Sequence, residues 1–326
     1  LKQHKVLLPT SERAAAITEQ AEAVAAEAGL ELVADEALAL ENAGLTEWPT
    51  VLMGSFDEAF LDVPPECLIT SMRAHQKCFS LRDPKTGKLA NRFLCVTNLI
   101  AQDDGAEIIA GNEKVIRARL ADAKFFWEQD LKRQLEPMRL QLASITFHAK
   151  LGTQAERVAR ITALAREIAP AVGAKPDLAA EAAAICKADL TSEMVYEFPE
   201  LQGTMGKYYA EKAGHDDGVP EACETHYSPL GPGDDVPTHP VAAAVALADK
   251  IDILTGFWAI DERPTGSKDP YALRRAALGV IRLVLVNKLR VPIDQIADAQ
   301  LLRHHIAPGA NHEDAKLLKE LLTQIA

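Results

Sequence analysis

The chain has 326 residues, of which 48% are hydrophobic and 25% are charged. This is the composition of an ordinary globular protein, and the length suits two domains. The formal net charge of −12 argues against a protein that simply coats nucleic acid. Charged residues interrupt every apolar run before it reaches the ~18 residues of a membrane helix, so we expect no membrane contact. The chain begins with Leu1 and not with Met, so we expect a fragment of a longer polypeptide.

The five cysteines form neither a regular disulfide framework nor a regular metal-binding set. Their spacing is irregular and includes no Cys-x-x-Cys pair: Cys67, Cys78, Cys95, Cys186 and Cys223. An odd, scattered set is typical of a reduced protein, so we expect a cytoplasmic localisation. We interpret these side chains as small buried hydrophobes.

Charge is distributed unevenly along the chain. Residues 177–236 contain thirteen Asp or Glu and three Lys, a balance of −10. Residues 268–290 contain six Lys or Arg and one Asp, a balance of +5. This asymmetry leaves room for a polyanionic partner on one face.

The first part of the chain has a mixed α and β pattern. Ser11 is predicted to cap a helix over residues 12–28, which Gly29 ends. A second helix is predicted to begin at Pro64-Pro65 and to reach about Gln76. Strand-like runs lie at 49–54, 77–81 and 92–97, and the turn-forming residues 83–88 predict that the last two pair as a hairpin.

The later part of the chain has almost no strand signal. A helix over about 113–133 is predicted to bury a stripe of Ile116, Leu120, Ala123 and Trp127. A Thr153–Glu156 capping box should open a helix that stops before Pro170. Further helices are predicted from Asp177 to about Glu197 and over about 200–213, then a long loop over 214–239, and two helices whose first residues are Pro240 and Pro270.

These patterns predict an α+β fold with two domains. We assign residues 1–135 to a partial mixed α/β domain and residues 136–326 to an all-helical domain. Three short segments of the second domain resemble the metal site of the HD superfamily, which uses a His, a His-Asp pair and a distant Asp. The resemblance implies that His148 matches the first His, Asp189 the Asp of the pair, and Asp249 the last ligand, each on a successive helix.

One departure from the HD pattern leaves two interpretations. Ala188 stands where the His of the pair belongs, and Lys187 and Lys250 place positive charge nearby. Because a metal-activated hydroxide needs a complete ligand set and the full field of the cation, we favour a degenerate HD-like site without metal or catalytic residues. The alternative is a metal-dependent HD-type phosphohydrolase.

Longer strings carry a more specific resemblance. Three of them occupy residues 111–126 (GNEKVIRARLADAKFF), 197–206 (EFPELQGTMG) and 267–277 (SKDPYALRRAA), with support from Glu47-Trp48-Pro49, Gln76-Lys77 and Leu151-Gly152-Thr153. Together they closely resemble the beta subunit of bacterial glycyl-tRNA synthetase, the heterotetrameric type with two alpha and two beta subunits. The resemblance spans roughly residues 40 to 290, in the family's own order.

The resemblance implies a function and partners. Family beta chains are about twice as long, assist the attachment of glycine to tRNA(Gly), and carry an α/β part that resembles the phenylalanyl-tRNA synthetase beta subunit. The catalytic alpha subunit holds ATP and Mg. We therefore expect no cofactor in this fragment, the alpha subunit and tRNA(Gly) as partners, and neither DNA nor membrane. A purely structural helical scaffold, with no RNA binding and no hydrolysis, is the remaining alternative.

Basic residues are candidates for RNA or subunit binding. Lys114, Arg117 and Lys124 lie beside the apolar stripe of one helix, and Lys268, Arg274, Arg275 and Arg282 lie in the basic segment. Arginine and lysine on a helix suit a phosphate backbone. The alternative for the first set is a solvated face with Glu113–Arg117 and Lys124–Glu128 pairs. In the second set, we expect Arg282 to be more exposed than Arg275.

Overall fold

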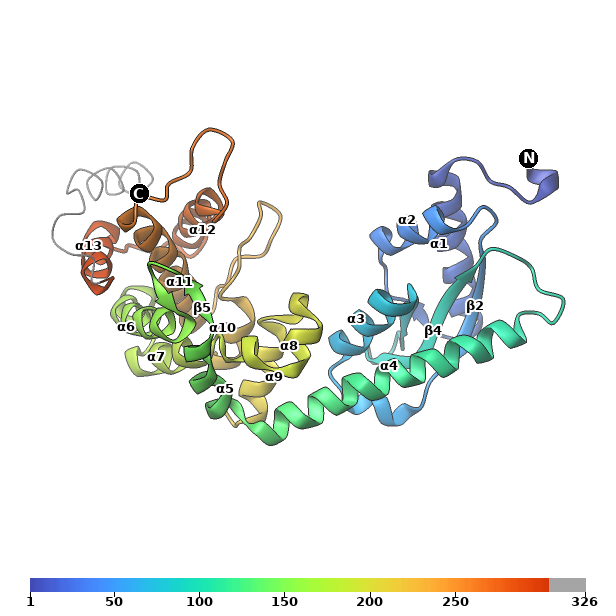
Figure 1. Ribbon diagram of the computed structural model, residues 1–326, viewed down its shortest axis with the longest axis horizontal. Coiled ribbons are helices and arrows are strands. Elements are labelled where there is room, and N and C mark those ends of the chain that lie inside the picture. Colours follow the sequence, from blue (N-terminus) through green and yellow to red (C-terminus); the bar gives the residue numbers. More distant parts are fainter. Residues whose placement is uncertain (305–326) are drawn as a thin grey trace. The chain divides into compact units, whose positions relative to one another are not determined.

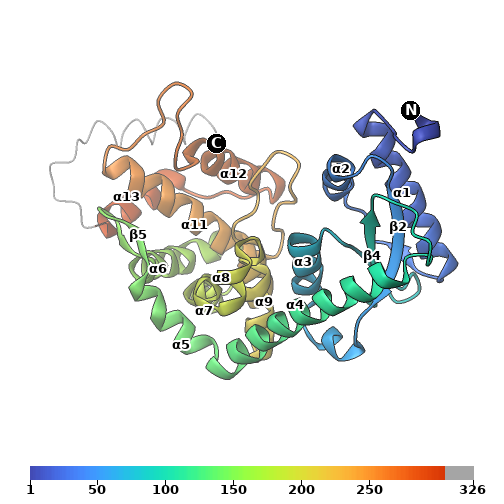
Figure 2. The same cartoon turned by 45° about the vertical axis from the view of Figure 1, so that its right-hand side comes forward.

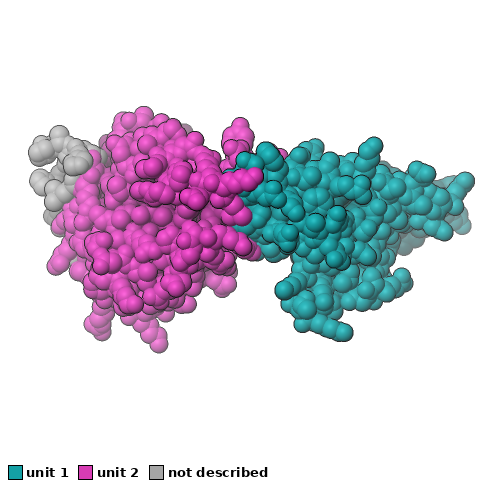
Figure 3. Space-filling model, turned by 90° about the horizontal axis from the view of Figure 1, so that it is seen from below, with its two compact units in different colours: residues 1–129 teal, residues 130–326 magenta. Residues whose placement is uncertain are grey.

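The computed structural model describes residues 1–304 and divides the chain into two compact units, residues 1–129 and 130–326 (Figure 3). The end of the predicted second domain, residues 305–326, lies outside the described residues. The break between the units falls inside one long helix, slightly before the predicted 135/136 boundary. The predicted α+β fold class is confirmed, because helices accompany a small antiparallel sheet (Figure 1).

The first unit is built around the antiparallel sheet, whose strand order is β1-β3-β4-β2. Its strands are β1 (Glu31–Leu32), β2 (Thr50–Ser55), β3 (Phe79–Arg82) and β4 (Leu89–Thr97). Its helices are α1 (Thr10–Glu27), α2 (Glu36–Leu45), α3 (Pro65–Gln76), the first part of α4 (Ala106–Arg133), and the 3-10 helices η1 (Lys2–His4) and η2 (Glu58–Asp62). The predicted hairpin is confirmed, since β3 pairs with β4.

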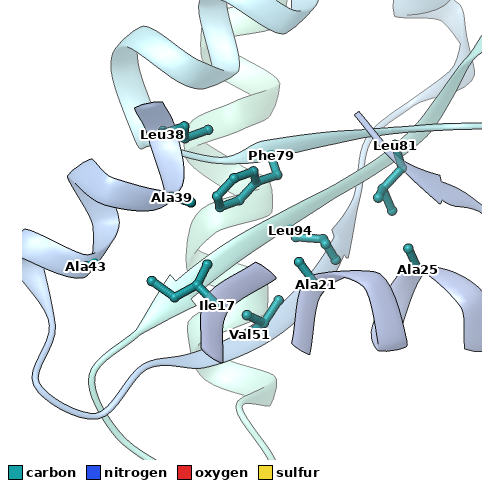
Figure 4. Packing of buried hydrophobic residues seen from close by; sticks show 10 residues of the cluster. All are labelled: Ile17, Ala21, Ala25, Leu38, Ala39, Ala43, Val51, Phe79, Leu81 and Leu94. Carbon is teal, nitrogen blue, oxygen red and sulfur yellow. The ribbon is translucent and has the colours of Figure 1, made fainter. Parts of the chain in front are cut away.

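The core of this unit lies between the sheet and the helices α1 and α2. Ile17, Ala21 and Ala25 recur at helical spacing along α1 and face inward-pointing strand residues (Figure 4). The buried cluster comprises Ile17, Ala21, Ala25, Leu38, Ala39, Ala43, Val51, Phe79, Leu81 and Leu94. The predicted stripe of α4 is also confirmed, with Ile116, Leu120, Ala123 and Trp127 all buried.

Several details of the first unit differ from the prediction. Ser11 does not cap α1, which begins at Thr10 after Pro9 without a side-chain cap. Helix α4 begins at Ala106 and not near residue 113. Neither β1 nor α2 was predicted, although Asp35 caps α2 by accepting a hydrogen bond from the Leu38 backbone at 2.8 Å.

The second unit is mainly helical. Its α-helices are α5 (Leu135–Gln141), α6 (Gln154–Val172), α7 (Pro176–Ile185), α8 (Glu193–Glu197), α9 (Thr204–Lys212), α10 (Val219–Thr225), α11 (Pro240–Ala259), α12 (Leu273–Val286) and α13 (Ile293–Arg303). Its 3-10 helices are η3 (Leu142–Ser144), η4 (Ala188–Thr191) and η5 (Pro199–Leu201). Helix α11 is buried along most of its length, and α6, α7, α10 and α12 pack against it (Figures 1 and 2).

The all-helical prediction for this part was wrong. Strands β5 (Thr146–His148) and β6 (Gly152–Thr153) form a two-stranded antiparallel sheet. Strand β6 begins at Gly152, directly after the turn, and its φ of +85° is a conformation that only glycine adopts readily. Two strands this short carry no alternating pattern long enough to recognise in a sequence.

Helix ends in the second unit show which local signals were reliable. The Thr153–Glu156 capping box and Pro240 at a first helical turn are both confirmed. Helix α6, however, runs through Pro170 and ends at Val172, because Gly173 closes its last turn with a left-handed cap.

The remaining boundary predictions in this unit need correction. The helix predicted from Asp177 to Glu197 is three shorter elements, α7, η4 and α8, because Ser192 caps a new helix by accepting from the Val195 backbone at 3.1 Å. The helix predicted over 200–213 begins only at Thr204, after Gly203 with a φ of +86°. The predicted loop 214–239 contains α10.

Helix α12 begins later than its proline suggested. Its first residue is Leu273 and not Pro270. The carboxylate of Asp269 accepts hydrogen bonds from the backbone of Leu273 at 2.8 Å and of Arg274 at 2.9 Å. It therefore satisfies two amide groups in the first turn of α12, although Asp269 itself lies outside the helix.

Candidate functional site: a buried ion network

Two pairs of opposite charges join helices α6 and α11. Arg157 and Arg160 lie one turn apart on α6, and Asp249 and Asp252 lie one turn apart on α11. Arg157 donates to Asp249 at 2.9 Å, and Arg160 donates to Asp252 at 2.9 Å. All four side chains are at most 11% exposed, so these pairs act in a poorly solvated interior where an unpaired charge is costly.

Lys187 brings a further cation into the same network. It is only 1% exposed, and its Nζ lies 2.9 Å from Oδ1 of Asp249. The same Nζ lies 3.0 Å from Nε2 of His226 and 4.1 Å from the centre of the Tyr227 ring. The lysine ammonium therefore occupies the space between a carboxylate, an imidazole and an aromatic face.

His226 has the tautomer that suits this contact. Its Nδ1 lies 2.9 Å from the carbonyl oxygen of Cys223, so Nδ1 carries the proton and donates it. Nε2 is then left to accept from the Lys187 ammonium. Burial and the positive charge of Lys187 hold the pKa of His226 well below its usual value, so the ring is neutral.

The neighbouring charges fix the ionisation of Asp249. Burial by itself would raise the pKa of this carboxyl, but Arg157 and Lys187 hold the pKa well below its usual range. Burial lowers the pKa of Lys250 to about 8, and its Nζ donates to the carbonyl oxygen of Tyr227 at 2.9 Å. Asp249 is thus an anion already neutralised by side chains of the protein.

Asp189 lies in a different setting. Its Oδ2 accepts hydrogen bonds from the backbone of Gly203 at 2.6 Å and of Gly206 at 3.1 Å. A Cβ on Gly206 would come within 3.3 Å of this carboxylate, so the close approach of α9 favours a glycine. Burial raises the pKa of Asp189 to about 6.

His148 is separate from both carboxylates in its contacts. It lies on β5, with its Nε2 3.5 Å from Glu262 and its ring against Phe257 and Tyr271. The prediction that His148, Asp189 and Asp249 lie on successive helices was therefore wrong, because they lie on β5, η4 and α11.

The described residues do not fit a divalent cation. Within residues 1–304, no group of three or more His, Cys, Asp or Glu side chains is arranged to hold one. Arg157 and Lys187 instead supply the positive charge next to Asp249, and the backbone amides of Gly203 and Gly206 bind Asp189. The HD-like character of this unit stays a prediction, and the alternative of a metal-dependent phosphohydrolase gains no support.

The first set of basic candidates lies on α4. Lys114 and Arg117 are exposed, whereas Lys124 is half-buried and donates to the carbonyl oxygen of Ala59 at 2.8 Å. Neither of the two alternative pairs forms within the described residues. Glu113 accepts from the backbone and hydroxyl of Ser55, both at 2.8 Å, and does not pair with Arg117. Lys124 lies 3.9 Å from Asp62 and does not pair with Glu128.

The second set lies on and before α12. Lys268, Arg274 and Arg275 are exposed. Arg282 is half-buried and donates to the carbonyl oxygens of Gly231 at 2.5 Å and Asp234 at 2.7 Å. The expectation that Arg282 is more exposed than Arg275 was wrong, because this arginine fastens the loop before α11 onto α12.

Among the residues of the network, Arg157, Arg160 and His226 were not predicted. One signal was available for the arginines. Asp249 and Asp252 stand in a helix that is otherwise almost wholly apolar, so buried partners with the same spacing were to be expected nearby. The pair Arg157 and Arg160 has that spacing. His226 lies in a segment predicted to be loop and had no comparable signal.

Comparison with known proteins decides the family. The family model for the glycyl-tRNA synthetase beta subunit matches residues 1–325. The chain therefore belongs to the glycyl-tRNA synthetase beta subunit family. The predicted resemblance is confirmed, and the match includes both units and the ion network.

Individual relatives agree with this assignment. The chain is 62% identical over 301 residues to the glycine–tRNA ligase beta subunit of Ruegeria sp. (strain TM1040). The aligned region covers 91% of this chain and 44% of the relative. The chain is 56% identical over 322 residues to the glycine–tRNA ligase beta subunit of Cereibacter sphaeroides (strain ATCC 17029). Here the aligned region covers 98% of this chain and 46% of the relative. The glycine–tRNA ligase beta subunit of Phenylobacterium zucineum is 53% identical to this chain over 305 residues. The aligned region covers 93% of this chain and 46% of that relative. The chain spans less than half the length of these relatives.

Proposed function

We propose that this chain is part of a beta subunit that assists the attachment of glycine to tRNA(Gly), by binding a catalytic alpha subunit and the tRNA in the cytoplasm. The observation that carries the proposal is the family match over residues 1–325. Relatives named as beta subunits of glycine–tRNA ligase, at 53% to 62% identity, support it. No helix within residues 1–304 is long and apolar enough to cross a membrane.

The chain contributes binding and not chemistry in this proposal. Its most deeply buried titratable side chains already have partners within the protein: Asp249 binds Arg157 and Lys187, and Asp189 binds backbone amides. ATP and Mg belong to the alpha subunit, and the fragment supplies no catalytic residue. The ion network then has a structural role, which is to hold α6, α11 and Lys187, the residue just before η4, together.

The exposed cations of the chain are the candidates for tRNA and subunit contact. Lys114 and Arg117 present two positive charges on one side of α4, where they can approach phosphate groups. Lys124 and Arg282 take a smaller part, because their charged ends already bind carbonyl oxygens of the protein. Lys268, Arg274 and Arg275 remain exposed, and of these Arg274 also donates to the carbonyl oxygen of Gly266 at 2.8 Å.

Glycine-dependent exchange between ATP and pyrophosphate tests whether amino-acid activation requires the alpha subunit. The purified chain, given glycine, ATP, Mg and labelled pyrophosphate, should show no exchange above background. Addition of the catalytic alpha subunit should produce exchange. Exchange by the chain alone would contradict the proposal, because it would require an amino-acid-activating site in this chain.

A further inference from the structure

Helix α12 has an apolar face turned toward solvent, in addition to the apolar face that it buries. Leu273, Val280 and Leu283 are buried, whereas Leu278 is 60% exposed, Leu285 is 63% exposed and Val286 is 53% exposed. Leu278 and Leu285 are seven residues apart, which is two turns of a helix, so they lie on the same side. Exposed aliphatic side chains that share one helix face are unusual on a monomeric surface and indicate contact with a partner.

The loop before α11 extends this face. Leu230 is 51% exposed and lies next to Gly231, whose carbonyl oxygen binds Arg282 of α12. The carboxylate of Asp234 accepts hydrogen bonds from the backbone of Leu230 at 2.7 Å and of Gly231 at 2.8 Å. Asn287 also donates to the carbonyl oxygen of Pro237 at 3.0 Å. The loop is therefore held against α12, and the exposed face exists before any partner binds.

Positive charge borders the same face. Arg275 lies one turn before Leu278 and is exposed, and within residues 1–304 it makes no ion pair. The carboxylate of Asp234 is close enough to interact with Arg275, and one of its oxygens, Oδ2, accepts hydrogen bonds from the loop backbone. Arg274 is also exposed. A partner that covers the aliphatic side chains would meet these arginines at its edge, and acidic side chains would complement them.

We propose that the α12 face, defined as Leu230, Arg275, Leu278, Leu285 and Val286, docks a protein surface that is apolar at its centre and acidic at its edge. This inference rests on the proposed function, in which that protein is the alpha subunit. A protein is favoured over RNA because aliphatic side chains occupy the middle of the face, where they exclude water from a protein contact but add nothing to a phosphate contact. Arginine beside leucine is a composition typical of protein interfaces.

The test uses the full-length beta subunit that contains this segment, together with the purified alpha subunit. Leu278→Asp combined with Leu285→Asp places two negative charges on the exposed face without touching the core. The dissociation constant for the alpha subunit, measured by sedimentation, should rise by about 100-fold. The affinity of the full-length beta subunit for tRNA(Gly) should change by less than about threefold. Leu140→Asp is the matched control, because Leu140 is 61% exposed on α5 of the same unit, and it should leave both affinities unchanged.

A charge reversal separates protein contact from RNA contact. Arg275→Glu should weaken binding of the alpha subunit by about tenfold at low salt, with a smaller effect at high salt. If Arg275→Glu instead weakens tRNA binding while assembly stays at the wild-type level, the face binds RNA and the inference is overturned. Circular dichroism and the melting temperature verify that each variant is folded.

The outcomes also separate this inference from the proposed function. If the wild-type beta subunit binds the alpha subunit and the double aspartate variant binds it equally well, only the docking face is refuted. If the wild-type chains do not associate at all, the proposed function fails and the docking inference fails with it.

Discussion

The ammonium of Lys187 lies 2.9 Å from a carboxylate oxygen of Asp249, and both side chains are buried. Arg157 reaches the same oxygen at 2.9 Å. The predicted HD resemblance assigns Asp249 as a ligand of a divalent cation, whereas in this structure Asp249 faces two cations that belong to the chain itself. Positive charge at this position is therefore permanent and does not depend on a metal supply.

Replacement of Lys187 by methionine should destabilise the second unit. The variant keeps most of the side-chain volume but removes the ammonium, which leaves His226 without its donor and Asp249 with less compensating charge. Breaking a buried ion pair in this way costs about 3–5 kcal/mol. Denaturant unfolding of the purified chain measures the loss. Lys150→Met is the control, because the Lys150 side chain is 59% exposed, and it should change stability by less than about 0.5 kcal/mol. Wild-type stability in Lys187→Met would show that the network contributes little.

Stability should depend on pH through Asp189. Burial raises the pKa of this carboxyl to about 6 in the folded chain, above the ~3.9 of an unfolded aspartate. The folded state therefore binds this proton more tightly, so the contribution of Asp189 is complete below about pH 4 and is lost as pH rises toward 6. Asp189→Asn does not titrate and retains an oxygen for the Gly203 amide.

Melting temperatures of the two proteins between pH 4 and pH 7 test this prediction. As pH rises through this interval, the melting temperature of Asp189→Asn should increase relative to that of the wild type, and the difference should then become constant. A difference that is the same at every pH would show that Asp189 titrates normally.

Gly54 should be required for the sheet of the first unit. It stands opposite Phe93 in the register of β2 and β4, and a Cβ at this position would lie 2.4 Å from the ring. Gly54→Ala should therefore destabilise the unit by about 1–3 kcal/mol through overpacking. Hydrogen exchange of peptides from β2 and β4 reports the effect. Gly44→Ala in α2 is the matched control, since no atom lies within 4 Å of its added Cβ, and it should be neutral or slightly stabilising.

Local signals explain how much of the fold could be predicted. The Thr153–Glu156 capping box, the stripe from Ile116 to Trp127 and the turn at 83–88 each act within a few residues, and the structure contains all three. The ion network could not be predicted in the same way. Lys187 and His226 are 39 residues apart in the chain, and Arg157 and Asp249 are 92 apart. Only tertiary packing brings such residues together.

The basic residues illustrate the same limit. Composition located a positive segment at 268–290, but it could not predict which of its Lys and Arg side chains are exposed and which bind other groups of the protein. Arg282 binds two loop carbonyl oxygens, and Arg275 is exposed, although they share one helix. Arg282 is less exposed because the loop before α11 packs against α12 at this residue. That loop was predicted only as an irregular segment. The assignment of these residues to RNA or subunit contact stays a prediction.

Arg282→Ala should release the loop before α11 without unfolding the unit. The variant loses two charge-assisted hydrogen bonds, to Gly231 and Asp234, while the buried face of α12 is unchanged. Hydrogen exchange at residues 230–236 should accelerate by about tenfold or more. Arg275→Ala, which removes an exposed arginine of the same helix, should leave exchange in this loop at the wild-type rate. Equal rates in both variants would show that Arg282 does not hold the loop.

Reconstituted charging of tRNA(Gly) tests the central claim most directly. The assay measures the initial rate at which labelled glycine is attached to tRNA(Gly), with the catalytic alpha subunit alone, with the full-length beta subunit alone, and with both. The account predicts charging only when both subunits are present. Charging by the alpha subunit alone at the rate of the mixture would contradict it, because the beta subunit would then contribute nothing to the reaction.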